Sequence, residues 1–216
     1  MTKPWVKICG ITNREDAMEA IRLGADALGF NLWSGSKRYV PFQENAQWIA
    51  ALPEGVERVA VLVNAPIDEA QTAARHPAFH AVQFHGNEDA AYITEFAKSG
   101  RPFILAIRLG AHGPDRSNLT LANRLLLDAA VPGEFGGTGV LPDLDLAASF
   151  VQSAQGRRVI LAGGLTPENV QTAVRHVRPF GVDVASGVEE SPRRKDWGKL
   201  DRFFAAARSG VFQGSQ

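Results

Sequence analysis

The chain has 216 residues, of which 45% are hydrophobic and 21% are charged, a balance that can bury a sizeable core. The formal net charge is zero, so nothing favours nucleic acid or an acidic membrane surface as a partner. The single cysteine, Cys9, cannot form an internal disulfide, and the N-terminal segment lacks the apolar run of a signal peptide, which together indicate a cytoplasmic protein.

Short apolar runs recur along the chain, each bounded by Gly, Asn or Asp. Such runs are typical of strands in a buried parallel sheet. The expected strands are Val6–Cys9, Ala27–Asn31, Arg58–Val63, Ala81–His85, Phe103–Arg108, Leu125–Asp128, Arg158–Ala162 and Val182–Ala185.

Segments with helical periodicity lie between these strands. In the first of them Asn13 can act as N-cap, acidic residues follow in the first turn, and Gly24 ends the helix. A later helix is expected to open with Thr166 as N-cap and Pro167 at the first helical position. Between the fifth and sixth strands the chain is rich in helix breakers, so we expect the helix there to be short.

Eight such units predict a single-domain (β/α)8 TIM barrel with a parallel eight-stranded core and helices outside it. No linker rich in Gly, Pro or Ser divides the chain, so we expect the barrel over residues 1–209 and a mobile C-terminal tail over residues 210–216. The alternative is an open doubly wound sheet, which usually has fewer strands and a G-x-G-x-x-G turn after the first. The first turn here reads CGITN, which favours the barrel.

Catalytic groups in a barrel lie where strands end and βα loops begin. Cys9 ends the first strand, and alternation places Lys7 on its face, where a cation can favour a thiolate nucleophile or general base. Asp128 ends the sixth strand, where burial can keep a carboxyl group protonated as a general acid. Two structural alternatives stay open: Cys9 as a small buried apolar residue, and Asp128 as a capping or turn residue.

Two further features at strand ends suit anionic groups. Arg38, just beyond the second strand, can present a planar fork to a carboxylate or phosphate, or it can belong to a solvated basic loop. Gly163-Gly164 and Ser186-Gly187 follow the seventh and eighth strands, where exposed backbone N–H groups hold phosphate in many barrels. Tight turns that need glycine are the alternative for these loops.

The segment Gly136–Gly139 reads GGTG and could be a third phosphate loop or a mobile lid. The sequence has neither paired cysteines nor a carboxylate–histidine cluster, so we expect no metal site.

Several segments, taken in order, resemble the phosphoribosylanthranilate isomerase family, whose members are barrel enzymes of tryptophan biosynthesis. The matching segments are VKICGIT, GADALGF, SKRYV, VLVN, AVQFHG, LLLDA, GGTG, AGGLTPENV and VDVASGVE. They run from Val6 to Glu189, and VKICGIT and VDVASGVE together are highly specific for the family. After Gly139 the chain departs from many family members, because Val140 stands where they have a lysine.

The resemblance implies an Amadori rearrangement without a cofactor, with Cys9 as general base and Asp128 as general acid. It also implies that Arg38 faces the anthranilate moiety and that the two glycine loops hold the phosphate. Further substrate contacts are expected from Gln83, His85 and Asp183. The expected partner is a small phosphorylated substrate, and the sequence does not decide between a monomer and a homodimer.

Alternation also predicts a contact across the barrel. Lys7 and Asp183 occupy inward positions on the first and eighth strands, which are neighbours in a closed barrel. A charge in a packed interior is costly unless it is paired, so we expect a buried Lys7–Asp183 ion pair beneath Cys9. The alternative is that Lys7 tilts upward to contact substrate or water.

Two other functions fit parts of the pattern. Another phosphosugar isomerase or epimerase barrel would share the glycine loops, although the related histidine-pathway isomerase normally uses two strand-end aspartates rather than a cysteine. A non-catalytic protein that binds a phosphorylated ligand would also keep the loops, but it need not keep Cys9 and Asp128 together.

Overall fold

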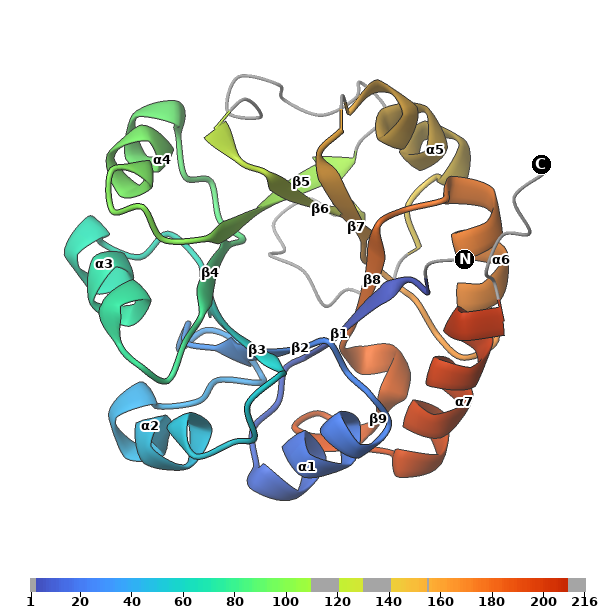
Figure 1. Cartoon of the computed structure of the whole chain (residues 1–216), viewed down its shortest axis with the longest axis horizontal. Coiled ribbons are helices and arrows are strands. Elements are labelled where there is room, and N and C mark those ends of the chain that lie inside the picture. The colour runs from blue at the N-terminus through green and yellow to red at the C-terminus, as the bar shows by residue number, and fades with distance from the viewer. Residues whose placement is uncertain (1–2, 110–120, 130–140, 155, 210–216) are drawn as a thin grey trace.

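The computed structural model describes residues 3–109, 121–129, 141–154 and 156–209. Eight parallel strands close into a barrel that is surrounded by helices (Figure 1). The strands are β1 (Trp5–Cys9), β2 (Ala27–Asn31), β3 (Glu57–Leu62), β4 (Ala81–Phe84), β5 (Phe103–Leu109), β6 (Arg124–Ala129), β7 (Arg158–Leu161) and β8 (Gly181–Val184). The barrel expected from the sequence is therefore confirmed, each strand lies within one residue of its expected bounds, and the open-sheet alternative is wrong.

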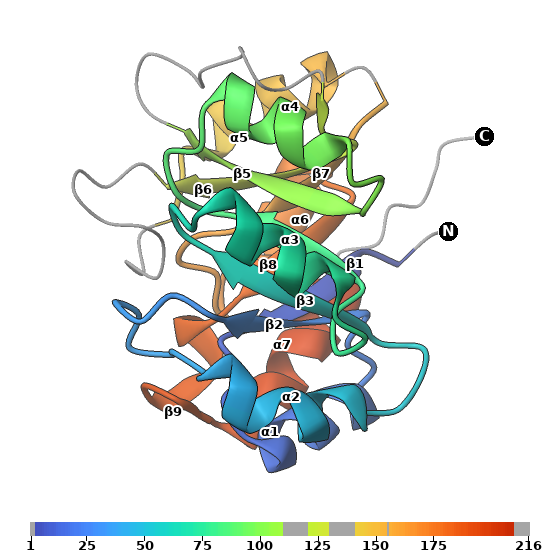
Figure 2. The ribbon, with the colours of Figure 1, turned by 90° about the vertical axis from the view of Figure 1, so that its left-hand side faces the viewer.

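The helices pack around the outside of the strands, as the side view also shows (Figure 2). They are α1 (Arg14–Arg22), α2 (Phe42–Ala50), α3 (Ile67–Arg75), α4 (Ala90–Ala97), α5 (Leu144–Ser153), α6 (Val170–Val177) and α7 (Trp197–Ser209). Between β8 and α7 the chain adds a short 3-10 helix, η2 (Ser186–Val188), and an antiparallel hairpin of β9 (Glu189–Ser191) and β10 (Arg194–Lys195).

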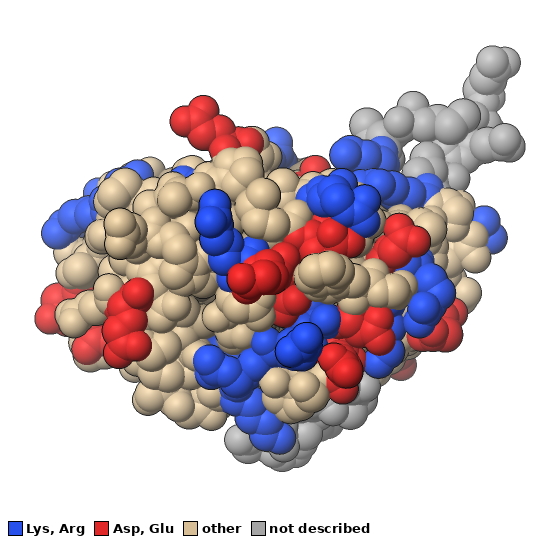
Figure 3. Space-filling model, turned by 90° about the horizontal axis from the view of Figure 1, so that it is seen from below, with Lys and Arg blue, Asp and Glu red and all other residues tan. Residues whose placement is uncertain are grey.

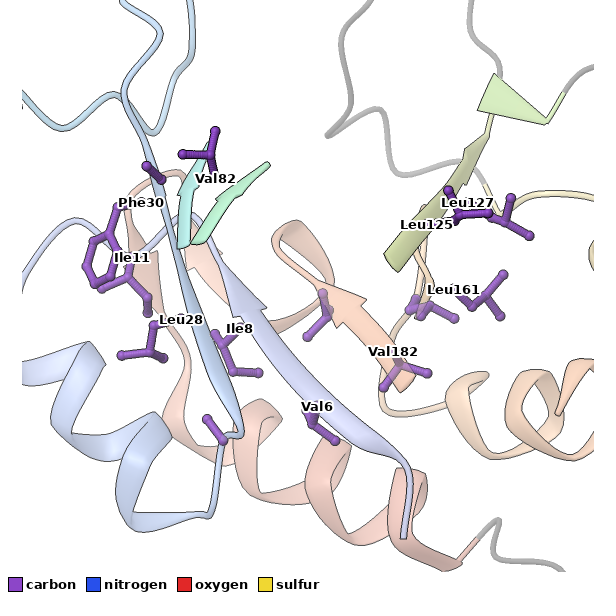
Figure 4. Close-up of a cluster of buried hydrophobic side chains, with 14 of the residues drawn as sticks. Val6, Ile8, Ile11, Leu28, Phe30, Val82, Leu125, Leu127, Leu161 and Val182 are labelled. Atoms are coloured by element: carbon purple, nitrogen blue, oxygen red, sulfur yellow. The ribbon is translucent and has the colours of Figure 1, made fainter. Parts of the chain in front are cut away.

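Two apolar layers hold the barrel together. The larger one lies between strands and helices and includes Val6, Ile8, Leu28 and Val182, all fully buried or nearly so (Figure 4). The smaller one fills the barrel interior with side chains from β2 to β7, among them Ala27, Val59, Ala81, Ile104, Leu126 and Ile160. Because successive residues of a strand point to opposite faces, a mostly apolar strand supplies both layers.

Polar side chains in the interior are concentrated at the two ends of the barrel. At the N-terminal end Glu57 and Arg124 form an ion pair of 2.6 Å. Toward the C-terminal end the inward positions carry Lys7, Gln83, Asp128 and Asp183, all buried. The packed middle thus forms a floor under a polar upper layer, which is where barrels place their active sites.

Local rules explain the helix starts only in part. The Asn13 side chain accepts a hydrogen bond of 2.8 Å from the Asp16 N–H, which confirms the expected cap of α1. Thr166 was expected to cap α6, but that helix begins at Val170. Thr166 instead opens a turn, in which its hydroxyl accepts from the Glu168 N–H at 3.2 Å and its carbonyl accepts from the Val170 N–H.

Some expectations fall on residues that the structure does not describe: the segment 110–120 of the short helix, the segment Gly136–Gly139 with Val140, and the tail 210–216. In the described part of the chain no helix is both long and apolar enough to cross a membrane. On the surface, basic and acidic side chains are interspersed over the face shown in Figure 3, where neither sign dominates.

Candidate active site

A pocket opens at the C-terminal ends of the strands, directly above the polar upper layer. Its walls bring together residues that the sequence singled out, and these residues come from six of the eight βα units. They include Cys9, Arg38, His85, Asp128, Gly163, Gly164, Asp183, Ser186 and Gly187. Sequence-distant groups with the chemistry of acid, base and anion binding therefore share one cavity.

Cys9 stands over a buried ion pair. Lys7 lies two residues below it on β1 and pairs in register with Asp183 on β8. The Lys7 Nζ atom donates to Asp183 Oδ1 at 2.8 Å, and the lysine side chain is fully buried. The predicted Lys7–Asp183 pair is confirmed, so Asp183 both lines the pocket and neutralises the charge beneath Cys9.

The electrostatic balance at Cys9 differs from the one expected. Burial raises the pKa of the Cys9 thiol, the nearby cation Lys7 lowers it, and the net result is a raised pKa. The expectation that Lys7 favours the thiolate is thus right in direction, but it does not outweigh desolvation. Burial also lowers the pKa of Lys7, but the charges of Asp183 and Cys9 outweigh that effect and leave the pKa raised.

On the other side of the mouth Asp128 ends a chain of hydrogen bonds. Its Oδ1 atom accepts from the Ala129 N–H at 2.9 Å, and its Oδ2 atom lies 3.0 Å from His85 Nε2. His85 Nδ1 in turn lies 2.9 Å from Gln83 Nε2. Gln83 is fully buried, is not among the residues that line the pocket, and contacts His85 from below.

Arg38 is held by a residue that sequence reasoning missed. Its Nε and Nη2 atoms donate to the two oxygens of Glu189 at 2.7 and 2.6 Å. The edge of the guanidinium that carries Nε is therefore taken, and Arg38 is not part of a solvated loop. The paired carboxylate raises the pKa of Arg38 beyond its already high value.

Lys195 completes this second buried network. Its Nζ atom donates to Glu189 Oε1 at 3.0 Å and to the carbonyl oxygens of Cys9 and Ala185 at 2.7 and 3.1 Å. Neither Glu189 nor Lys195 was predicted as a site residue. The sequence signal was present only for Glu189, which stands two residues after the expected phosphate loop.

The two glycine loops lie against each other. Gly163 and Gly164 adopt left-handed backbone conformations, with φ of 84° and 54°. A Cβ atom on Gly187 would lie 1.8 Å from the Leu165 carbonyl oxygen, so only glycine permits this close approach. The loop after the eighth strand forms the short 3-10 helix η2, and its first residue is Ser186. Backbone N–H groups at such a helix start suit a phosphate group.

Comparisons with known sequences agree with this site. A family model described as N-(5'phosphoribosyl)anthranilate (PRA) isomerase matches residues 6–206. A Neisseria meningitidis protein named N-(5'-phosphoribosyl)anthranilate isomerase is 42% identical over 210 residues, which cover 96% of this chain and 98% of the relative. A protein of the same name from Magnetococcus marinus is 42% identical over 205 residues and covers 94% of each chain.

Solved structures give the same picture. Phosphoribosyl anthranilate isomerase from Thermotoga maritima superposes with a TM-score of 0.84 at 35% identity, covering 95% of this chain and 99% of that one. A second such isomerase, in complex with reduced 1-(o-carboxyphenylamino)-1-deoxyribulose 5-phosphate, has a TM-score of 0.81, 34% identity and the same coverage. A 3-hexulose-6-phosphate synthase from Salmonella typhimurium, at 15% identity and a TM-score of 0.67, shares the fold alone.

Proposed function

The chain belongs to the N-(5'-phosphoribosyl)anthranilate isomerase family, and we propose that Cys9 is its general base and Asp128 its general acid. The enzyme is an isomerase of tryptophan biosynthesis, which converts N-(5'-phosphoribosyl)anthranilate into 1-(o-carboxyphenylamino)-1-deoxyribulose 5-phosphate. The observation that supports these roles most is that Cys9, Asp128 and the two glycine loops line one pocket.

The reaction needs one proton donor and one proton acceptor. Asp128 donates a proton to the furanose ring oxygen, the bond from that oxygen to C1' breaks, and the nitrogen lone pair forms a Schiff base. Cys9 then removes the proton from C2', and the electrons of that bond give an enolamine that tautomerises to the ketone. Each step is a proton transfer with bond rearrangement inside one molecule, so the reaction runs without a cofactor.

The remaining site residues bind and orient the substrate. The backbone N–H groups of Gly163, Gly164, Ser186 and Gly187 hold the phosphate, which supplies binding energy far from the reacting carbons. Arg38 faces the anthranilate moiety. His85 contacts Asp128 and, together with Asp183, faces the ribose from opposite sides of the mouth.

Two further assignments belong to this proposal. The barrel forms one domain over residues 1–209, which is supported by the ring of strands that pairs β1 with both β2 and β8. The enzyme acts in the cytoplasm, which is supported by the single cysteine and its proposed role as a thiol rather than a disulfide partner.

The activity is tested with purified protein and N-(5'-phosphoribosyl)anthranilate, by following the loss of substrate fluorescence. We expect saturable turnover that needs no added metal or cofactor. A protein that leaves this substrate unchanged but isomerises a phosphosugar without an anthranilate group would favour the other barrel isomerases. A protein that binds the substrate without turnover would favour the non-catalytic alternative.

A further inference from the structure

The hairpin β9–β10 places a buried carboxylate and a buried ammonium beside the pocket, outside the set of predicted site residues. We propose that Glu189 and Lys195 are positioning residues that fix the Arg38 guanidinium as the receptor for the carboxylate of the aromatic substrate moiety. The inference rests on the proposed function, because it concerns how this enzyme recognises the anthranilate end of its substrate.

The geometry of Arg38 leaves one edge free for a ligand. A guanidinium has five N–H donors, and two of them, on Nε and Nη2, are taken by Glu189. Nη1 and the second hydrogen of Nη2 form another fork, and Nη1 has no hydrogen-bond partner among the described residues. Because Arg38 lines the pocket, this second fork can take a carboxylate with two parallel bonds.

The stem of Arg38 is fixed as well as its head. Gly10 has a φ of 71°, and a Cβ atom on it would lie 2.3 Å from Arg38 Cδ. The arginine stem therefore lies directly on the glycine turn after β1, next to Cys9. With the stem resting on Gly10 and the head held by Glu189, few rotamers of Arg38 remain, so little conformational entropy is lost when a ligand binds.

Glu189 is itself held in place. Lys195 donates to three acceptors, and only the ammonium form has three N–H donors, so the contacts indicate a charged lysine. Burial lowers the pKa of Lys195, and the carboxylate of Glu189 opposes that effect without cancelling it. The backbone of Lys195 donates to the buried Asp16 of α1 at 2.9 Å, which ties the hairpin to the barrel wall.

The net charge of Arg38, Glu189 and Lys195 favours an anionic ligand. With the Cys9 thiol protonated, Arg38 and Lys195 contribute two positive charges and Glu189 one negative charge, so these three side chains together carry one positive charge in excess. Lys7 and Asp183 cancel each other below them. A ligand with one carboxylate on its aromatic ring neutralises that excess, whereas a ligand that lacks the carboxylate leaves it uncompensated near a low-dielectric wall.

Two probe ligands separate the contact with the carboxylate from the contacts with the sugar and the phosphate. One is reduced 1-(o-carboxyphenylamino)-1-deoxyribulose 5-phosphate, the ligand of the related crystal structure. The other is the same compound with an unsubstituted phenylamino group, which lacks the carboxylate but keeps the sugar and phosphate. The ratio of the two dissociation constants, measured by calorimetry, isolates the carboxylate contact. We expect the wild-type enzyme to prefer the first probe by at least about 10-fold.

Glu189→Gln removes the charge that orients Arg38 and keeps the size of the side chain. It should lower the preference for the carboxylated probe by about 10-fold, leave the affinity for the phenylamino probe near the wild-type value, and raise KM more than it lowers kcat. Arg38→Lys should lose the same preference. Glu190→Gln is the matched control, because Glu190 is exposed and pairs with Arg194 on the surface of the same hairpin.

If Glu189→Gln does not fold, Glu189→Asp gives the same test, since it keeps the charge but is too short to reach both Arg38 nitrogens. Near-normal affinity of a variant for the phenylamino probe shows that its barrel and phosphate loops are intact. A Glu189 variant that keeps the wild-type preference would overturn the inference and leave a merely structural ion pair. Wild-type protein that turns over its substrate without preferring the carboxylated probe would overturn it too. Wild-type protein that neither turns over nor binds either probe would overturn the proposed function itself.

Discussion

Around Cys9 the site is built from buried charges, whereas the described hydrogen-bond partners of Asp128 are groups without a permanent charge. On the Cys9 side, Lys7 pairs with Asp183 and Lys195 pairs with Glu189, at 2.8 and 3.0 Å. On the Asp128 side, the partners are an imidazole, a backbone N–H and, behind the imidazole, an amide.

The difference suits the two roles. His85 can place its single proton on either ring nitrogen, so it can donate to a carboxylate or accept from a carboxyl group, and Asp128 keeps a partner in both protonation states. The charged side chains around Cys9 cannot exchange donor and acceptor roles in this way. Burial raises the pKa of the Cys9 thiol, the cations Lys7 and Lys195 oppose that effect, and Asp183 adds to it. The partners of Asp128 can adapt when Asp128 gains or loses its proton. The charges near Cys9 instead set the pKa at which the thiol loses its proton.

The largest expected effect comes from removing the reactive group on either side. Cys9→Ala and Asp128→Asn should each lower kcat by at least about 100-fold, the size of a general acid–base contribution. Folding should survive, because both side chains lie at the rim of the barrel. Steady-state fluorescence assays measure kcat, and thermal unfolding is the control. Near-normal turnover in either variant would remove that residue from its proposed role.

The second effect tests whether the Cys9 side depends on paired charges for stability. Lys7→Met strands Asp183 in the interior and should lower the free energy of unfolding by about 3–5 kcal/mol, as measured in urea. The double variant Lys7→Met/Asp183→Leu should cost less than the sum of the two single changes, because it leaves no charge uncompensated. Strict additivity of the two changes would show that the pair is not coupled.

The third effect is a pH dependence that arises on the Cys9 side. The thiolate is the active base, and burial raises the pKa of the Cys9 thiol, so the thiolate fraction grows as the pH rises through the alkaline range. We expect the rate at which iodoacetamide alkylates Cys9, which needs the thiolate but not Asp128, to increase with pH over that range, by about tenfold per unit below this pKa. Lys195→Met should move the increase to higher pH, because Lys195 lowers the pKa of Cys9. An increase whose position is the same in both proteins would contradict this account.

The smallest expected effect concerns the row of hydrogen bonds that links Gln83, His85 and Asp128. Gln83→Leu removes the partner of His85 Nδ1 but leaves the contact between His85 and Asp128. The lost hydrogen bond is one residue removed from Asp128, so we expect kcat to fall by about 3- to 10-fold, with KM little changed. Ile104→Val, a change in the apolar floor, serves as the matched control in rate assays. A loss as large as that of Asp128→Asn would mean that Gln83 participates in catalysis directly.

The fold could be predicted because each of its rules is local. Strand length, alternation and glycine turns fix the eight strands to within a residue, and closure of the barrel then makes Lys7 and Asp183 neighbours. Thr166 shows the limit of such rules. Its hydroxyl accepts a hydrogen bond within a turn, and the local sequence does not distinguish this turn from the start of a helix.

The contacts of Arg38 could not be predicted in the same way. Glu189 lies 151 positions away in the chain, on a hairpin that follows the last barrel strand and obeys no barrel periodicity. The next residue in sequence, Glu190, is also a glutamate, so the residue type alone does not distinguish the buried Glu189 from the exposed Glu190. The position of Arg38 just beyond the second strand suggested an anion-binding arginine, but only the folded chain shows which edge of its guanidinium remains available.

Closure of the barrel also has a consequence for the order in which the enzyme is made. Cys9 is synthesised well before the charged residues of its neighbourhood, because Asp183 lies 176 positions after Lys7 and Lys195 lies 186 positions after Cys9. A nascent chain therefore contains Cys9 long before it contains Asp183 and Lys195, whose charges shift the pKa of the Cys9 thiol. A fragment that ends before β8 lacks both Asp183 and Lys195, so catalytic competence appears only after β8 and the β9–β10 hairpin have been added.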